Sequence, residues 1–161
     1  MTSYKIRPAE KHDMHEVLLL IKELAVFEKE PEAVEITVED LQRDGFGEKK
    51  LFFCFVAEVE GQIQGMALAY FRYSTWKGKT VHLEDLIVRE EFRGIGLGAG
   101  LYEKVMQFAK NEGVKRVEWV VLDWNSGAIE FYKKTGATIL KNWHLAQFDE
   151  KALDKFLSNR K

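Results

Sequence analysis

Arg93-Gly94-Ile95-Gly96-Leu97-Gly98 is the segment of this sequence most diagnostic of its architecture. It follows a strand-like run from Thr80 to Val88 and opens an amphipathic helical pattern that ends at Gly113. The first turn of a helix has unpaired backbone N–H groups and a partial positive charge, so it favours an anion. Glycines also let the backbone itself approach the bound group. The segment therefore predicts a strand, a phosphate-binding loop and a helix in succession.

Several kinds of loop share this pattern. A P-loop needs Gly-Lys-Ser/Thr, which this segment lacks. Gly94, Gly96 and Ala99 satisfy a loose dinucleotide fingerprint, but the acidic residue that should follow about 20 positions on is Asp123, about 30 positions away. A glycine turn that only lets a helix pack closely is the structural alternative. Pyrophosphate binding is the interpretation that we favour.

The rest of the sequence predicts an α+β fold with one parallel βαβ crossover, which carries this loop. Residues 51–59, 63–72 and 80–88 have strand composition, and Glu60-Gly61-Gln62 reads as a hairpin turn. Residues 114–122 and 143–148 are two more expected strands. Helices are expected over about 13–28, after Thr37, after Ser126 as N-cap and after Asp149, and Asp13 with Glu16 reads as a capping box.

Length and composition indicate one domain over residues 1–161 that binds a small molecule. The 161 residues include 24 basic and 26 acidic side chains, so no basic field attracts nucleic acid. Cys54 is the single cysteine, which excludes an internal disulfide and a multi-thiolate metal site, and we expect no metal. The sequence shows no export signal and no apolar run of membrane-spanning length. We therefore expect a cytoplasmic protein that does not bind membranes.

Two spaced motifs resemble those of the GNAT acetyltransferases. Arg93, Gly96 and Gly98 fill the pattern Arg/Gln-x-x-Gly-x-Gly/Ala of their motif A. The second signature follows at the usual distance: Trp124-Asn125, Ala128, Phe131-Tyr132-Lys133 and Gly136-Ala137. The resemblance implies the GNAT fold, a mixed and mostly antiparallel central sheet flanked by helices, and acetyl-CoA as co-substrate.

Residues from Ile6-Arg7 to about Phe148 further resemble the diamine acetyltransferases, which comprise spermidine/spermine N1-acetyltransferases and thialysine Nε-acetyltransferases. Landmarks are Ile21-Lys22-Glu23-Leu24-Ala25, Asp44-Gly45-Phe46-Gly47 and Leu83-Glu84-Asp85. Residues 27–29, 73–78 and 121–125 look more like the thialysine group. Ser74 stands where the polyamine enzymes typically have an aspartate, which favours an amino-acid-like or short diamine substrate over spermidine.

The resemblance also implies roles for individual residues. Tyr132 would be the general acid, and Glu84 would take the proton of the amine through water. The residues expected to hold acetyl-CoA are Leu86, Ile87, Val88, Arg93, Gly94, Ile95, Gly96, Leu97, Gly98, Ala99, Asn125, Ser126, Gly127 and Ala128. Those expected to contact the amine are Phe27, Glu28, Glu84 and Trp76. The family also implies a homodimer.

The residues themselves leave alternatives to several of these roles. Tyr132 has the helical spacing of a core aromatic, and the acidic run from Glu28 to Glu35 has the composition of a solvated loop. Glu84 and Asp85 are adjacent on a strand, so pleating predicts opposite faces, with Glu84 functional and Asp85 structural. Cys54 could carry an acetyl group, but its apolar neighbours predict an inert thiol and direct transfer in a ternary complex.

The sequence thus predicts an acetyl-CoA-dependent N-acetyltransferase that acts on the primary amine of a small molecule. A polyamine N1-acetyltransferase is the nearest alternative. A non-catalytic acyl-CoA sensor on the same fold and a protein acetyltransferase are more distant ones, because a fold alone does not fix a function.

Overall fold

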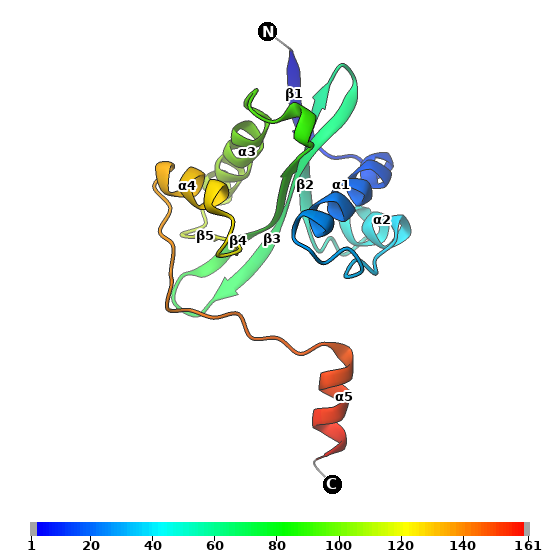
Figure 1. Cartoon of the computed structure of the whole chain (residues 1–161), viewed down its shortest axis with the longest axis vertical. Helices are drawn as coiled ribbons and strands as arrows, with labels where there is room; N and C mark the ends of the chain where they lie inside the picture. Colours follow the sequence, from blue (N-terminus) through cyan, green and yellow to red (C-terminus); the bar gives the residue numbers. More distant parts are fainter. Residues whose placement is uncertain (1–2, 160–161) are drawn as a thin grey trace. The chain divides into compact units, whose positions relative to one another are not determined.

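The computed structural model describes residues 3–159 of the chain (Figure 1). It divides into two compact units, one that reaches to Val120 and one that starts at Val121. The first unit holds the sheet and three helices, and the second holds two helices. Within the described residues, no helix is long and apolar enough to cross a membrane.

The first unit is built on a five-stranded sheet in the order β1-β2-β3-β4-β5. The strands are β1 (Tyr4–Pro8), β2 (Phe53–Val59), β3 (Gln62–Ser74), β4 (Gly78–Val88) and β5 (Val117–Glu118). The first four pair antiparallel, whereas β5 pairs parallel to β4 at Val81↔Val117 and His82↔Glu118. This arrangement confirms the α+β class, the mixed sheet and the single parallel crossover.

Helices cover both faces of this sheet (Figure 1). On one face, α1 (Met14–Phe27) and α2 (Val38–Phe46) pack on side chains such as Val56, Met66 and Leu68. On the other face, α3 (Leu97–Asn111) makes the crossover between β4 and β5, and its Phe108 ring lies 4.0 Å from that of Phe53. The alternation of apolar side chains along β2 and β3 supplies both halves of the core.

The sequence predicted the capping residues of some helices correctly and of others wrongly. Thr37 and Asp40 form a capping box at α2, as expected. Asp13 does not pair with Glu16: it closes a capping box with Glu10 around a 3₁₀ turn, Lys11–Asp13, and its carboxylate lies 2.6 Å from Arg7. An ion pair with Arg7 on β1 therefore holds the carboxylate that the local pattern assigned to α1.

The second unit contains α4 (Ser126–Lys134) and α5 (Glu150–Ser158). Asp149 caps α5 through the N–H of Ala152, as predicted. The N-cap of α4 is Asn125 and not Ser126, because the Asn125 side chain accepts from the N–H of Ala128 at 3.2 Å. The strand expected over residues 143–148 is absent from the described chain, where these residues are exposed and irregular.

Candidate active site

The glycine segment lies between β4 and α3, as its pattern predicted. After β4 a 3₁₀ turn, Glu90–Phe92, leads into Arg93, whose Nε donates to the carbonyl of Val88 at 3.0 Å. Gly94 and Gly96 have φ values of 81° and 96°, which side chains with a Cβ rarely adopt. Arg93 thus fastens the end of β4 to a loop whose backbone depends on glycine.

The space around this loop argues against glycines that serve only internal packing. A Cβ added at Gly94 would meet no described atom within 4 Å, and one at Gly98 would make only ordinary contact with Val88. Gly100 differs, because a Cβ there would lie 2.5 Å from Ile6. Gly96 is the N-cap of α3 and brings no capping side chain. The first N–H groups of α3 are therefore left for an anion.

The end of β4 is open on the side of the crossover. Strand β5 pairs with β4 only as far as His82, so among the described residues no strand joins the backbone of Leu86, Ile87 and Val88 on that side. The side chains of Ile87 and Val88 are buried, as is that of Leu97. Contacts of these residues with a co-substrate would therefore be made by their backbone groups.

A β-bulge decides how the acidic residues of β4 lie. Ala69 pairs with Leu83 and the preceding Leu68 pairs with Asp85, so Glu84 is an extra residue between them. Tyr70 pairs with His82, which places His82 and Asp85 on one face of the sheet. The expected separation of Glu84 and Asp85 by simple pleating was wrong, because that argument assumes a strand without a bulge.

Three carboxylates act on one another at this bulge. Burial, followed by the charges of Glu84 and Glu28, raises the pKa of Asp85 to about 7. Burial and the charge of Glu84 likewise raise the pKa of Glu28. Glu28 is held as the C-cap of α1, and Lys29 after it takes a left-handed conformation with φ of 67°. We refer to Glu28, Glu84 and Asp85 as the carboxylate cluster.

A contact links this cluster to the glycine loop. The Arg93 guanidinium carbon lies 5.8 Å from the centroid of the Phe27 ring, which is next to Glu28 on α1. Ile95, between the two glycines of the loop, is 42% exposed, and Ala99 is exposed on the first turn of α3. Phe27, Glu28, Glu84 and the residues from Leu86 to Ala99 thus belong to one region of the first unit.

The other predicted site residues lie elsewhere. Tyr132 and the segment Asn125, Ser126, Gly127 and Ala128 belong to the second unit, at and beyond the start of α4. Tyr132 is 8% exposed and its ring meets that of Phe131 edge-on at 5.5 Å. Trp76 is 78% exposed in the turn between β3 and β4, about 20 Å along the strand from Glu84 at the usual rise per residue. Within the described chain, Trp76 is therefore not brought to the carboxylate cluster.

Comparison with known proteins identifies the family. A model of the acetyltransferase (GNAT) family matches residues 14–137, which is most of the chain. The chain belongs to the GNAT acetyltransferase family. It is therefore an N-acetyltransferase, and the match covers the glycine loop, the carboxylate cluster and Tyr132.

Individual relatives of this GNAT chain indicate which branch of the family it resembles. The chain is 40% identical to the thialysine N-epsilon-acetyltransferase of Bos taurus over 95% of its own length and 96% of that protein. It is 39% identical to the spermidine/spermine N(1)-acetyltransferase-like protein 1 of Homo sapiens over 95% of its length, which is only 24% of that longer protein. Both identities confirm the predicted resemblance to the diamine acetyltransferases.

Solved structures agree on the GNAT fold. An integron cassette protein from the mobile metagenome of V. cholerae superposes with a TM-score of 0.79 at 22% identity, covering 98% of this chain and 99% of that one. The aminoglycoside N-acetyltransferase AAC(6')-Iy, solved in complex with CoA, superposes with a TM-score of 0.73 at 18% identity, covering 92% and 96%. At these identities the comparison bears on the fold alone.

Two features of this GNAT site were missed by sequence reasoning. Asp85 interacts with the charge of Glu84, which simple pleating did not predict, and His82 and Tyr70 lie beside Glu84 as well. The sequence does carry a signal for His82. It lies two positions before Glu84 on a largely apolar strand, which predicts that both side chains point to the same face. The position of Asp85 had no such signal, because the bulge depends on pairing with β3.

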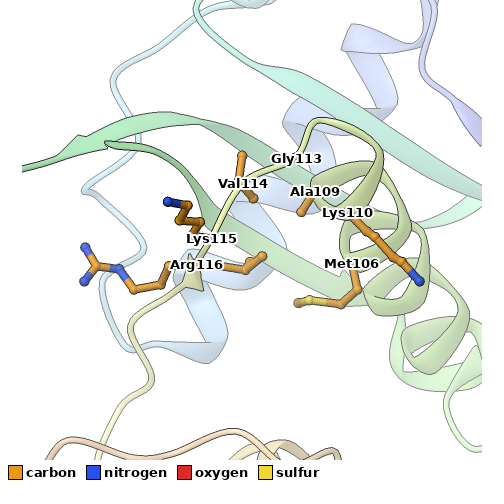
Figure 2. A pocket seen from close by; sticks show the side chains of 8 residues that line it. Met106, Ala109, Lys110, Gly113, Val114, Lys115 and Arg116 are labelled. Atoms are coloured by element: carbon orange, nitrogen blue, oxygen red, sulfur yellow. The ribbon is translucent and has the colours of Figure 1, made fainter. Parts of the chain in front are cut away.

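The carboxylate cluster is the candidate catalytic centre. Among the described residues, no group of three or more His, Cys, Asp or Glu is arranged to hold a metal ion. An open depression of about 360 Å³ lies at the far end of α3 from the glycine loop (Figure 2). Its lining residues are Met106, Ala109, Lys110, Gly113, Val114, Lys115, Arg116 and Val117, none of them a predicted site residue.

Proposed function

We propose that this GNAT chain transfers the acetyl group of acetyl-CoA to a primary amine of a thialysine-like amino acid or a short diamine. The observation that carries the proposal is the carboxylate cluster of Glu28, Glu84 and Asp85 at the bulge of β4. The negative charges of these three carboxylates repel one another. A bound cation relieves that repulsion, and an alkylammonium group is such a cation. The thialysine enzyme of Bos taurus, at 40% identity, supports the same substrate class.

We propose direct attack in a ternary complex. Neutralising an alkylammonium with a pKa of about 10.4 at pH 7 costs about 4 to 5 kcal/mol. Glu84 takes that proton through water, and the freed lone pair attacks the thioester carbonyl. A C–N bond forms, the C–S bond breaks, and Tyr132 gives its proton to the departing thiolate. The second proton of the attacking nitrogen passes through water to the resulting tyrosinate, which restores Tyr132 and leaves a neutral amide. Asp85, with a pKa raised to about 7, is a second group able to hold the proton near neutral pH.

The residues that would hold acetyl-CoA fit a pyrophosphate-bearing ligand. Gly94 and Gly98 leave open space outside the loop, and α3 begins at a glycine with no capping side chain. The N–H groups of Leu97, Gly98 and Ala99 would then bind the pyrophosphate. The segments 86–88 and 125–128 would bind the rest of the co-substrate, the first through its backbone groups.

Ser74 supports a short substrate over a long polyamine. Its hydroxyl accepts from the N–H groups of Trp76 and Lys77, both at 3.2 Å, so it is used within the β3–β4 turn. A neutral turn residue supplies no charge for the distant amine of a polycation. Polyamine N1-acetylation is therefore the second candidate function. The human spermidine/spermine N(1)-acetyltransferase-like relative, at 39% identity, is the observation that supports it.

The deciding experiment is a thiol-release assay with acetyl-CoA and thialysine, lysine, putrescine, spermidine or a histone-tail peptide as acceptors. We expect the highest kcat/KM with thialysine or putrescine. Preference for spermidine would establish the polyamine alternative, and preference for the peptide would establish a protein acetyltransferase. Binding of acetyl-CoA without turnover on any acceptor would indicate a sensor.

Two variants test the assigned roles in the same assay. Tyr132→Phe keeps the ring and removes the acid, so we expect kcat to fall by about 100-fold or more. Glu84→Gln should lower turnover most below pH 8, where the neutral fraction of the amine is smallest. An unchanged pH profile in Glu84→Gln would remove Glu84 from the mechanism.

We further propose that both units act as one catalytic domain of a homodimeric, cytoplasmic enzyme. The family match from residue 14 to residue 137 crosses the boundary at Val120, which supports one domain. The single free thiol, Cys54, is consistent with a reducing compartment. Each unit expressed separately should be inactive, and activity of the first unit alone would overturn the one-domain proposal.

A further inference from the structure

His82 is a buried polar residue beside Glu84. It lies two positions before Glu84 on β4, is 8% exposed, and its Nε2 lies 3.5 Å from a carboxylate oxygen of Glu84. Its ring stacks on that of Tyr70, its partner on β3, with centroids 5.1 Å apart at 37°. Strand pairing therefore fixes the place of the imidazole next to the proposed proton acceptor.

The chemistry of the pair favours one tautomer of the imidazole. An ionised carboxylate only accepts hydrogen bonds, so a neutral ring can bond to Glu84 only as the tautomer that carries its proton on Nε2. Nδ1 is buried and meets no hydrogen-bond partner among the described residues, which suits the unprotonated nitrogen of that tautomer. The neutral ring thus presents a single donor, and this donor faces Glu84.

The surroundings keep the imidazole neutral. Burial lowers the pKa of His82, and Arg72 lowers it further, against the opposing charges of Glu84 and Glu118. Arg72 is itself paired with Glu118 at 2.8 Å, and Arg116 lies 2.9 Å from the same carboxylate. The charges that face His82 from β3, β4 and β5 therefore leave burial as the dominant effect.

Tyr70 supplies a second donor to the same carboxylate. Its hydroxyl interacts with Glu84, and burial together with the charge of Glu84 raises the pKa of Tyr70, so it remains a phenol. The Glu84 side chain is 51% exposed. An exposed glutamate loses conformational entropy when it is fixed in one rotamer, unless neighbours already hold it.

We propose that His82 is a positioning residue that, together with Tyr70, holds the Glu84 carboxylate in the orientation that accepts the proton of the amine. This inference rests on the proposed role of Glu84. The separation of 3.5 Å is longer than a hydrogen bond, and a small rotation of the Glu84 side chain on amine binding would close it. Orientation in advance of the reaction lowers the barrier of the chemical step more than it alters substrate affinity.

The test is steady-state kinetics on two substitutions of His82. His82→Phe keeps a ring on Tyr70 and removes the donor, so we expect kcat to fall by about 10-fold while KM for the amine changes less than about 2-fold. His82→Gln retains an N–H donor and should restore most of kcat. Equal losses in both variants, or a loss confined to KM, would overturn the positioning role.

Two controls separate positioning from damage to the sheet. Tyr70→Phe should lower kcat in the same way, whereas Tyr73→Phe, on the exposed end of β3, should leave kcat unchanged. Thermal unfolding of each variant reports whether β3 and β4 remain intact. A fall in kcat in Tyr73→Phe equal to that in Tyr70→Phe would count against the inference.

A double-mutant cycle distinguishes failure of this inference from failure of the proposed function. If His82 acts through Glu84, adding His82→Phe to Glu84→Gln should change kcat little. A full additional 10-fold loss in that background would overturn the inference. If Glu84→Gln lowers kcat but His82→Phe does not, only the role of His82 is wrong; if Glu84→Gln leaves kcat unchanged, the role of Glu84 fails as well.

Discussion

Asp85 makes the stability of the folded chain depend on pH. Its pKa is raised to about 7 in the fold by burial, Glu84 and Glu28, against about 3.9 in an unfolded chain. A carboxyl group with a raised pKa destabilises the fold once it ionises, so stability is lost as pH rises from about 4 to about 7. We expect Asp85→Asn to stabilise the chain, and to do so by about 2.5 kcal/mol more at pH 8 than at pH 5.

Urea unfolding of both proteins at the two pH values measures this difference. Asp123→Asn is the matched control, because Asp123 is exposed and precedes α4. The control should give the same small change at both pH values. An Asp85→Asn effect that is equal at pH 5 and pH 8 would show that Asp85 ionises normally in the fold.

Cys54 tests the order of acetyl transfer. The thiol is 7% exposed on β2, and burial, aided by the charges of Asp13 and Asp85, raises its pKa well above the usual range. A buried neutral thiol is a poor nucleophile. We therefore expect Cys54→Ala to retain kcat within about 2-fold, with a loss of about 1 kcal/mol in unfolding free energy for the methyl-sized cavity.

Initial-rate kinetics on the wild-type chain give the decisive pattern, because Cys54→Ala has no thiol at this position to carry an acetyl group. Intersecting lines in double-reciprocal plots indicate a ternary complex, whereas parallel lines indicate an acetylated enzyme. Loss of kcat in a variant that unfolds at the wild-type temperature would assign the acetyl group to Cys54. Direct attack on acetyl-CoA would then be wrong.

Single residues were predicted from sequence where their role depends on neighbours along the chain. The inert character of Cys54 followed from its apolar flanks, and the structure confirms its burial. The placement of Asp85 was wrong, because the bulge that turns it toward Glu84 arises from pairing with Leu68 on β3. A contact set by strand pairing is invisible to periodicity within one strand.

Two glycines with the same backbone conformation test the pyrophosphate loop. Gly94 has φ of 81° and Gly61, in the β2–β3 turn, has φ of 79°, and an added Cβ at either meets no described atom within 4 Å. Alanine at each position should therefore cost a similar amount, about 1 kcal/mol, from the left-handed backbone alone. Only Gly94→Ala should weaken acetyl-CoA binding, because only Gly94 lies where the backbone would approach the pyrophosphate.

Isothermal titration with acetyl-CoA and chemical unfolding of both variants measure the two quantities separately. We expect the dissociation constant to rise at least about 5-fold in Gly94→Ala and to stay unchanged in Gly61→Ala, at equal loss of stability. Equal affinities of the two variants for acetyl-CoA would show that the glycines of this loop have only a structural role.

Helices and strands could be predicted where the spacing of apolar residues and the capping residues indicate the same bounds. The strand, loop and helix around Arg93 to Gly98 were found within a few residues of their predicted bounds, as was α2 after Thr37. The strand expected at 143–148 is absent from the described residues, which are irregular and exposed over this segment. The expected strand 114–122 is reduced to Val117–Glu118, where β4 stops pairing near its bulge.

At the scale of the whole molecule, spacing between motifs carried more information than any one motif. The glycine segment alone left several kinds of loop open, whereas its distance from Asn125 and Tyr132 identified the family that the matched residues 14–137 confirm. The balance of charges argued against nucleic acid as a ligand, and the single cysteine argued against a multi-thiolate metal site, but neither identified the ligand. Assembly left no periodic signal, because an interface between copies needs only a suitable surface.

The C-terminal segment allows a test of the proposed homodimer. Seven large apolar side chains there are exposed: Leu140, Trp143, Leu145, Phe148, Leu153, Phe156 and Leu157. An apolar run of this size is unusual on an isolated monomer and typical of a surface that another chain covers. We expect light scattering of the full chain to report twice the monomer mass. The double variant Trp143→Ser, Leu145→Ser should shift that mass toward the monomer.

Leu51→Ser is the matched control, because Leu51 is 64% exposed just before β2, away in sequence from that segment. It should leave the dimer intact. Catalytic rate measured over the same dilution series shows whether dissociation costs activity. A monomer mass at every concentration tested would overturn the dimer, and the exposed apolar residues of the C-terminal segment would then need a different partner.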